Sequence, residues 1–116
     1  MKEAFIFETI RTARAASDED GSLKSMKAID LVTPLLKSIL DKNNLSKNAI
    51  DEVILGCAIQ KEEQGRHLAL ALSTSVGLHQ HASVSTVNKG RASAFEAIHL
   101  AATKVMTNHS KLNLAV

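Results

Sequence analysis

The sequence predicts an α/β fold built on a mostly parallel sheet. Short runs rich in β-branched and bulky aliphatic residues alternate with longer segments whose apolar residues recur at helical spacing. Strands separated by helices of this length are typical of βαβ crossovers, which place neighbouring strands in parallel. The predicted order is β-α-β-α-β-α-β, in one domain, because 116 residues can bury only one modest core.

Four apolar runs are the predicted strands. They are Ala4–Ile10, Val53–Cys57, Ser83–Val87 and Leu112–Val116. The first two are almost continuously apolar, as strands covered on both faces are. The third is more polar, which indicates an edge strand or a strand at an interface. Between the first strand and the first helix, the polar, acid-rich loop Ala13–Gly21 predicts an exposed and mobile turn.

The first two predicted helices follow from apolar spacing. Ile29, Val32, Leu36 and Ile39 recur at helical intervals in the first. Pro34 lies inside it, so either the helix kinks there or a new helix starts with Thr33 as its N-cap. The second helix is expected from about Gly65 to Val76, with Gly77 placed to terminate it.

The third predicted helix, Ala92 to Met106, is amphipathic. Phe95, Ile98, Ala102 and Val105 form one stripe, which we expect to pack on the sheet. Leu100 and Met106 flank that stripe.

Composition narrows the function classes. A net charge of +2 and an aromatic content of 3%, with basic residues scattered along the chain, argue against nucleic-acid binding. The N-terminal apolar run is too short for a signal peptide or a membrane span, so we expect no membrane association. The single cysteine, Cys57, excludes an internal disulfide, and a cytoplasmic location is expected. Its place at the end of an apolar strand favours a buried, inert thiol.

Several motifs in order resemble the N-terminal half of thiolases, particularly the β-oxidation 3-ketoacyl-CoA thiolases. They are Lys2–Ile6 leading to Arg11-Thr12, Gly21–Lys24, Asp30-Leu31, Ile50–Cys57, Glu63–Gly65 and Thr86–Ala94. Ordered matches along essentially the whole chain are far more specific than one short motif. The resemblance implies a strand order of 3-2-1-4. It also implies dimers that pair the third strand, here Ser83, Val84, Ser85, Thr86 and Val87.

The resemblance also implies a chemistry and shows where this chain departs from it. Thiolases transfer an acyl group from a coenzyme A thioester through a cysteine in the motif V-N-x-x-C-A/G-S-G. Here the motif includes Asn88, Ala92, Ser93 and Ala94, and the nucleophile position holds Arg91. A guanidinium offers hydrogen-bond donors only, so it cannot act as a nucleophile. The family's Arg-Thr-Pro-x-Gly turn is likewise altered, to Arg11–Ala15.

Residues 1–116 are expected to be a partial thiolase domain. In the family a fifth strand, a coenzyme A-binding loop region and a C-terminal half follow, and that half supplies a histidine and a second cysteine. The resemblance also implies that the C-terminal half covers the third helix, so without it Leu100 and Met106 are expected to be left exposed, which would favour self-association. We therefore expect a catalytically inactive thiolase homologue with no cofactor of its own. Two alternatives are an interaction subunit that completes its fold with another thiolase-like chain, and an acyltransferase in which another residue replaces the cysteine.

Other polar residues have both a functional and a structural interpretation. Lys89, Arg66 and His67 lie where they could hold an anion beside Arg91, although solvent exposure alone explains the arginine. His79 and His81 have the spacing of two metal ligands, but no third ligand lies nearby in sequence, so no metal site is expected. Ser93 is favoured as a structural residue at a helix start rather than as a nucleophile activated by His99.

Overall fold

The computed structural model describes residues 1–116 and has an α/β architecture with a three-stranded parallel sheet. The helices are α1 (Ala28–Lys42), α2 (Leu68–Ser75) and α3 (Ser93–Met106), with 3-10 turns η1 (Lys47–Ala49) and η2 (Glu62–Gln64). The strands are β1 (Glu52–Gly56), β2 (Ser83–Val87) and β3 (Asn113–Ala115). None of the helices is long and apolar enough to cross a membrane.

The central strand of the sheet is β1, in the order β2-β1-β3. Its parallel ladder with β2 pairs Glu52 with Ser83 and continues to Gly56 and Val87. On the other side Glu52 pairs with Asn113. Four of its five residues are buried, as expected of a strand covered on both faces. The predicted edge position of Ser83–Val87 is also confirmed.

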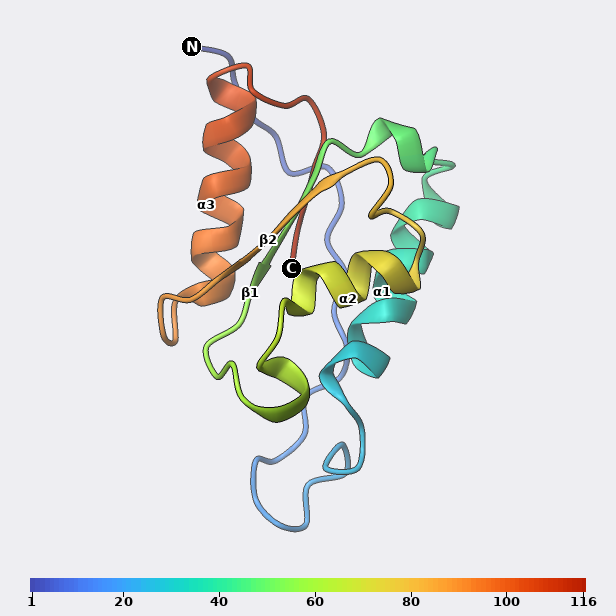
Figure 1. Cartoon of the computed structure of the whole chain (residues 1–116), viewed down its shortest axis with the longest axis vertical. Coiled ribbons are helices and arrows are strands. Elements are labelled where there is room, and N and C mark those ends of the chain that lie inside the picture. The colour runs from blue at the N-terminus through green and yellow to red at the C-terminus, as the bar shows by residue number, and fades with distance from the viewer.

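Helices cover both faces of the sheet, with α1 and α2 on one side and α3 on the other (Figure 1). The α1–α2 side holds the main core, a cluster of 13 buried residues that includes Val53, Leu55, Leu72 and Leu78. On the α3 side only Ile54, Ala97 and Ala101 are buried together. The sheet is therefore well covered on one face and thinly covered on the other.

The predicted first strand is wrong. Ala4–Ile10 has no strand pairing, and the strand order is not the 3-2-1-4 implied by the resemblance, because β1 pairs directly with β3. Phe5, Ile6 and Phe7 are 79%, 70% and 60% exposed. A high β propensity makes a strand only when another strand supplies hydrogen-bond partners, and here none does.

The predicted sheet-facing side of α3 is also wrong. Phe95 is 73% exposed and Ile98 41% exposed, whereas Ser93, Ala97 and Ala101, each four residues apart, are buried. The backbone of Gly56 explains this choice of face, because a Cβ placed there would lie 2.3 Å from the carbonyl group of Ser93. So close a contact admits only small side chains on the facing side of the helix.

The flanking residues of α3 also differ from expectation. Leu100 and Met106 are half-buried rather than exposed, and Leu100 packs against the small α3-side cluster. Of the face that the sequence assigned to the sheet, Phe95 and Ile98 are thus turned to solvent, whereas Ala102 and Val105 are half-buried.

The other two helices follow the prediction more closely. Helix α1 continues without a break through Pro34, so it does not restart at Thr33. Helix α2 begins at Leu68, three residues after the predicted start, because His67 caps its N-terminus by accepting a hydrogen bond from the N–H of Leu70. Gly77 follows α2 with φ of 74°, a conformation in which glycine has no side-chain penalty, as the predicted termination requires.

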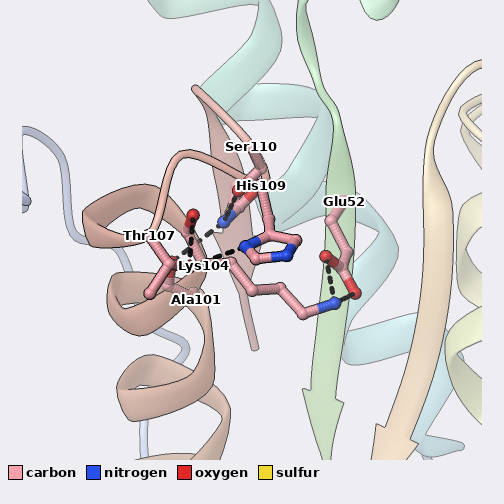
Figure 2. Close-up of polar contacts among 7 residues, drawn as sticks. Glu52, Ala101, Lys104, Thr107, His109 and Ser110 are labelled. Atoms are coloured by element: carbon pink, nitrogen blue, oxygen red, sulfur yellow. Dashed lines mark hydrogen bonds and ion pairs between the residues drawn. The ribbon is translucent and has the colours of Figure 1, made fainter.

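Two acidic residues tie the amino end of β1 to distant parts of the chain. Lys104 on α3 reaches both carboxylate oxygens of Glu52, at 2.5 and 2.6 Å (Figure 2). Asp51 accepts hydrogen bonds from the backbone N–H groups of Lys111 and Leu112, and these bonds lower the pKa of its carboxyl group. Both contacts hold β3 and the end of α3 against β1.

Candidate functional site

The candidate site lies at the carboxyl end of the sheet, where two helices begin close to two strand ends. Helix α2 follows β1, and α3 follows β2 after the short turn 88–92. In parallel α/β sheets ligands bind at this end, because the helix N-termini present free N–H groups there. A shallow hollow of about 370 Å³ at the opposite end of the sheet, near Lys37, Lys47 and Ser75, takes no part in this arrangement.

The turn between β2 and α3 is held by the side chain of Asn88. Its Nδ2 donates to the carbonyl of Ala58 at 3.1 Å, and its Oδ1 accepts from the N–H of Gly90 at 2.9 Å. Gly90 adopts φ of 57°, in the left-handed region where glycine is favoured. Asn88 therefore attaches the turn to the segment that follows β1 and also stabilises the turn internally.

Ser93, the first residue of α3, ties the helix to the preceding turn through its hydroxyl group. Its Oγ accepts from the N–H of Lys89 at 2.9 Å and donates to the carbonyl of Gly90 at 2.6 Å. The side chain is buried, at 3% exposure. Its hydroxyl proton and one lone pair are thus engaged within the turn, and His99 makes no contact with it, pairing instead with Glu96.

Arg91 lies exposed immediately before α3, at the position that the resemblance assigns to the nucleophile. Its side chain has no hydrogen-bond or ion-pair partner within the chain. The backbone N–H groups of Ala94 and Phe95, in the first turn of α3, also have no backbone acceptor. The turn therefore keeps free helix N-terminal donors, the feature that would lower the pKa of a thiol placed there.

The neighbouring cation Lys89 is not free. Its Nζ lies 2.6 Å from Oε2 of Glu96, one turn into α3, and this hydrogen bond lowers the pKa of Glu96. Lys89 and Glu96 come from a turn and a helix, so no helical spacing in the sequence indicated the pair. The contact leaves Arg91 and Arg66 as the unpaired cations of the predicted anion-binding group.

His67 has a defined structural role that the sequence did not predict. It is the N-cap of α2, where its Nδ1 accepts from the N–H of Leu70 at 3.3 Å. The same nitrogen lies 3.2 Å from Oγ1 of Thr86 on β2, and that hydroxyl in turn accepts from the N–H of Ala69 at 3.1 Å. Thr86 and His67 thereby attach the start of α2 to the end of β2.

The remaining candidates stay apart from this site. His79 and His81 are exposed in the turn before β2, and nowhere do three or more potential metal ligands gather. Cys57 is buried, as predicted, with its Sγ 3.4 Å from Oε1 of Gln64 and from the carbonyl of Ile59. Such a thiol is shielded from reagents.

Comparison with known proteins identifies the family to which this strand-turn-helix belongs. Residues 4–116 match the model of the thiolase N-terminal domain. The chain belongs to the thiolase family. It is 39% identical over 108 residues to a 3-ketoacyl-CoA thiolase of Shewanella loihica and 40% identical over 108 residues to one of Shewanella sp. strain MR-7. A third relative, from Shewanella oneidensis, is also a 3-ketoacyl-CoA thiolase and is 39% identical.

These matches cover the chain and the relatives very differently. Each alignment includes 92% of this chain but only 28% of the relative. The chain thus spans little more than a quarter of the length of the curated thiolases that it matches. The chain shares with these relatives the family and the part of the fold that residues 4–116 cover.

Proposed function

We propose that this chain is a thiolase-family segment of acyl-CoA and fatty-acid metabolism that does not catalyse acyl transfer, because Arg91 occupies the position of the acyl-accepting cysteine. The observation that carries the proposal is the geometry of the β2–α3 turn. Asn88, Gly90 and Ser93 hold the turn, and α3 presents free N–H groups, yet the side chain at the reacting position is a guanidinium.

The same geometry argues against a substitute nucleophile. Ser93 is buried and hydrogen-bonded on both sides, and Cys57 is buried in the core. A nucleophile needs an accessible atom and a base within about 3 Å. Neither residue meets both conditions, which supports an inactive segment over an acyltransferase with a replaced nucleophile.

The test is a thiolysis assay with acetoacetyl-CoA and free coenzyme A. The chain alone should show no turnover above background, and neither should Arg91→Cys, because the family's activating histidine and second cysteine lie in the C-terminal half. In a chimera, residues 1–116 would replace the matching part of the Shewanella loihica relative. There the Arg91 form should be silent and the Arg91→Cys form should turn over substrate. Turnover by the Arg91 chimera would refute the proposal.

A second candidate function is an interaction subunit that pairs with another chain, either a second copy through Ser83–Val87 or a thiolase-like partner. The open outer edge of β2 and the exposed Phe95 and Ile98 on α3 favour it. Light scattering after size-exclusion chromatography tests it, and a stable monomer at all concentrations would count against it. A cytoplasmic location accompanies both proposals, since the single cysteine suits a reducing compartment.

A further inference from the structure

His67 joins the start of α2 to the end of β2 through a single ring nitrogen, Nδ1. That nitrogen accepts from the N–H of Leu70 at 3.3 Å and lies 3.2 Å from Oγ1 of Thr86. The N–H of Leu70 also reaches the carbonyl oxygen of its own N-cap residue at 3.0 Å, whereas the N–H of the fully buried Ala69 has Oγ1 of Thr86, at 3.1 Å, as its only acceptor. The first turn of α2 therefore depends on these two side chains, one before the helix and one on the sheet.

These contacts require a neutral His67 with its proton on Nε2. A backbone N–H can only donate, so Nδ1 must present its lone pair to Leu70. Because Oγ1 of Thr86 uses a lone pair to accept from Ala69, its hydroxyl hydrogen can point at Nδ1. In the series from the Ala69 N–H through the Thr86 hydroxyl to the imidazole, each donor then meets an acceptor.

A proton on Nδ1 disrupts this series. The nitrogen becomes a donor, so it no longer accepts from Leu70, and the hydroxyl hydrogen of Thr86 loses its acceptor. The imidazolium also places a positive charge at the N-terminus of α2, where the helix dipole disfavours it. The ring of His67 is exposed to solvent, and histidine is the residue whose charge changes between about pH 8 and pH 5. The contacts are therefore present at the upper end of that range and are lost as the pH falls through it.

No charged group offsets this effect by pairing with His67. Helix α2 packs against α1, β1 and β2; β2 has no charged residue, and the only one on β1, Glu52, lies at the amino end of the strand. The charged residues of the segments around His67 are, in chain order, Lys27, Asp30, Glu62, Glu63, Arg66, Lys89 and Arg91. Lys89 pairs with Glu96, and none of the seven forms an ion pair with His67. Protonation of the ring thus gains no new partner in exchange for the contacts that it loses.

We propose that His67 is a pH-sensitive latch between α2 and β2. In its neutral form it orients the hydroxyl of Thr86 and holds the first turn of α2 against the end of β2, and in its protonated form it releases both. Thr86 lies two residues before Asn88, which holds the turn that carries Arg91. Release therefore loosens the carboxyl end of β2, where the candidate site lies, while the β1–β2 ladder stays intact. The latch operates whether or not the site is catalytic.

Nuclear magnetic resonance of the full, isotope-labelled chain tests the latch. At about pH 8 the ring of His67 should carry its proton on Nε2, and a ring protonated on Nδ1 would overturn the proposal. Protection of the Ala69 amide is its hydrogen-exchange rate relative to that of an unstructured peptide at the same pH. Between about pH 8 and about pH 5 this protection should fall at least about threefold, as loss of a helix cap predicts, and a smaller fall would overturn the proposal.

Three substitutions assign the effect to His67. Asparagine caps helices and does not titrate, so His67→Asn should make the protection of Ala69 independent of pH. Thr86→Val removes the hydroxyl group and should lower that protection at both pH values. His109→Asn is the matched control, because the Nδ1 of His109 also contacts a threonine, Thr107 at 2.8 Å, but lies beyond the end of α3; it should leave the pH dependence at Ala69 unchanged. PH dependence that persists in His67→Asn or disappears in His109→Asn, or protection that survives Thr86→Val, would overturn the latch.

Discussion

The contact between Gly56 and the first turn of α3 predicts a large effect from adding a single methyl group. A Cβ on Gly56 would lie 2.3 Å from the carbonyl carbon and oxygen of Ser93 and 2.4 Å from the nitrogen of Ala94. Ordinary contacts begin near 3.4 Å, so the helix would have to move by roughly 1 Å. Because backbone lies on both sides of the contact, rotamer changes cannot relieve it. We therefore expect Gly56→Ala to cost about 3 kcal/mol or more, at the upper end for overpacked sites.

The assay is urea unfolding followed by circular dichroism, with thermal unfolding as a second measure. A loss of 3 kcal/mol should lower the melting temperature of a chain of this size by about 10 °C or more. Gly90→Ala is the matched control. That site has no atom within 4 Å of an added Cβ but has φ of 57°, so it should cost only about 1 kcal/mol. If Gly56→Ala changed the unfolding free energy by less than the control does, the reasoning about close approach would be wrong.

Three further predictions concern the amino end of β1 and the core. Lys104→Met should lower the free energy of unfolding by about 3 kcal/mol, because it leaves the carboxylate of Glu52, which is 7% exposed, without its partner. Glu52→Gln should cost only about 1 kcal/mol, because the ammonium group of Lys104 can turn to solvent. Equal or reversed costs in urea unfolding would contradict this. Two backbone N–H groups lower the pKa of Asp51 below its ordinary value of 3.8, so its stabilisation is present above that value and is lost as pH falls through the folded pKa. Asp51→Asn should therefore weaken the acid dependence of unfolding measured between about pH 5 and 2, and an unchanged profile would argue against it. Leu72→Ala, at a side chain 1% exposed, should cost about 2–5 kcal/mol in denaturant, whereas Leu70→Ala, at 44% exposure on the same helix, should cost below about 1.

Local pattern predicted the elements whose neighbours agree with their own propensity. Ser83–Val87 has its predicted bounds, and β1 is shifted by only one residue, because both runs lie in a ladder that their residue types favour. Gly77 ends α2 as expected because a left-handed residue after a helix needs no tertiary partner. In these cases short-range physics and the final packing lead to the same structure.

The hydrophobic pattern gave wrong predictions where the backbone of residues distant in sequence determines which side chains are buried or whether a strand forms. The apolar stripe of α3 ranked Phe95 and Ile98 as core residues, but the bare backbone of Gly56 lies too close to the helix for side chains of that size. Ala4–Ile10 has the composition of a strand without the partner that would make it one. The roles of His67 and Glu96 were missed because each depends on a contact outside its own helix, with Thr86 on β2 and with Lys89 in the turn before α3.

The central position of β1 has a consequence for the order in which the chain folds. Glu52 pairs with Ser83, 31 residues later, and with Asn113, 61 residues later. Doubling a closed loop adds only about 0.6 kcal/mol, so the two ladders differ little in equilibrium cost. They differ in timing during synthesis, because at about 5–20 residues per second β3 leaves the ribosome roughly 3–12 s after β1. Throughout that interval one side of β1 has no neighbour, which gives chaperones a window of several seconds in which to bind the nascent sheet.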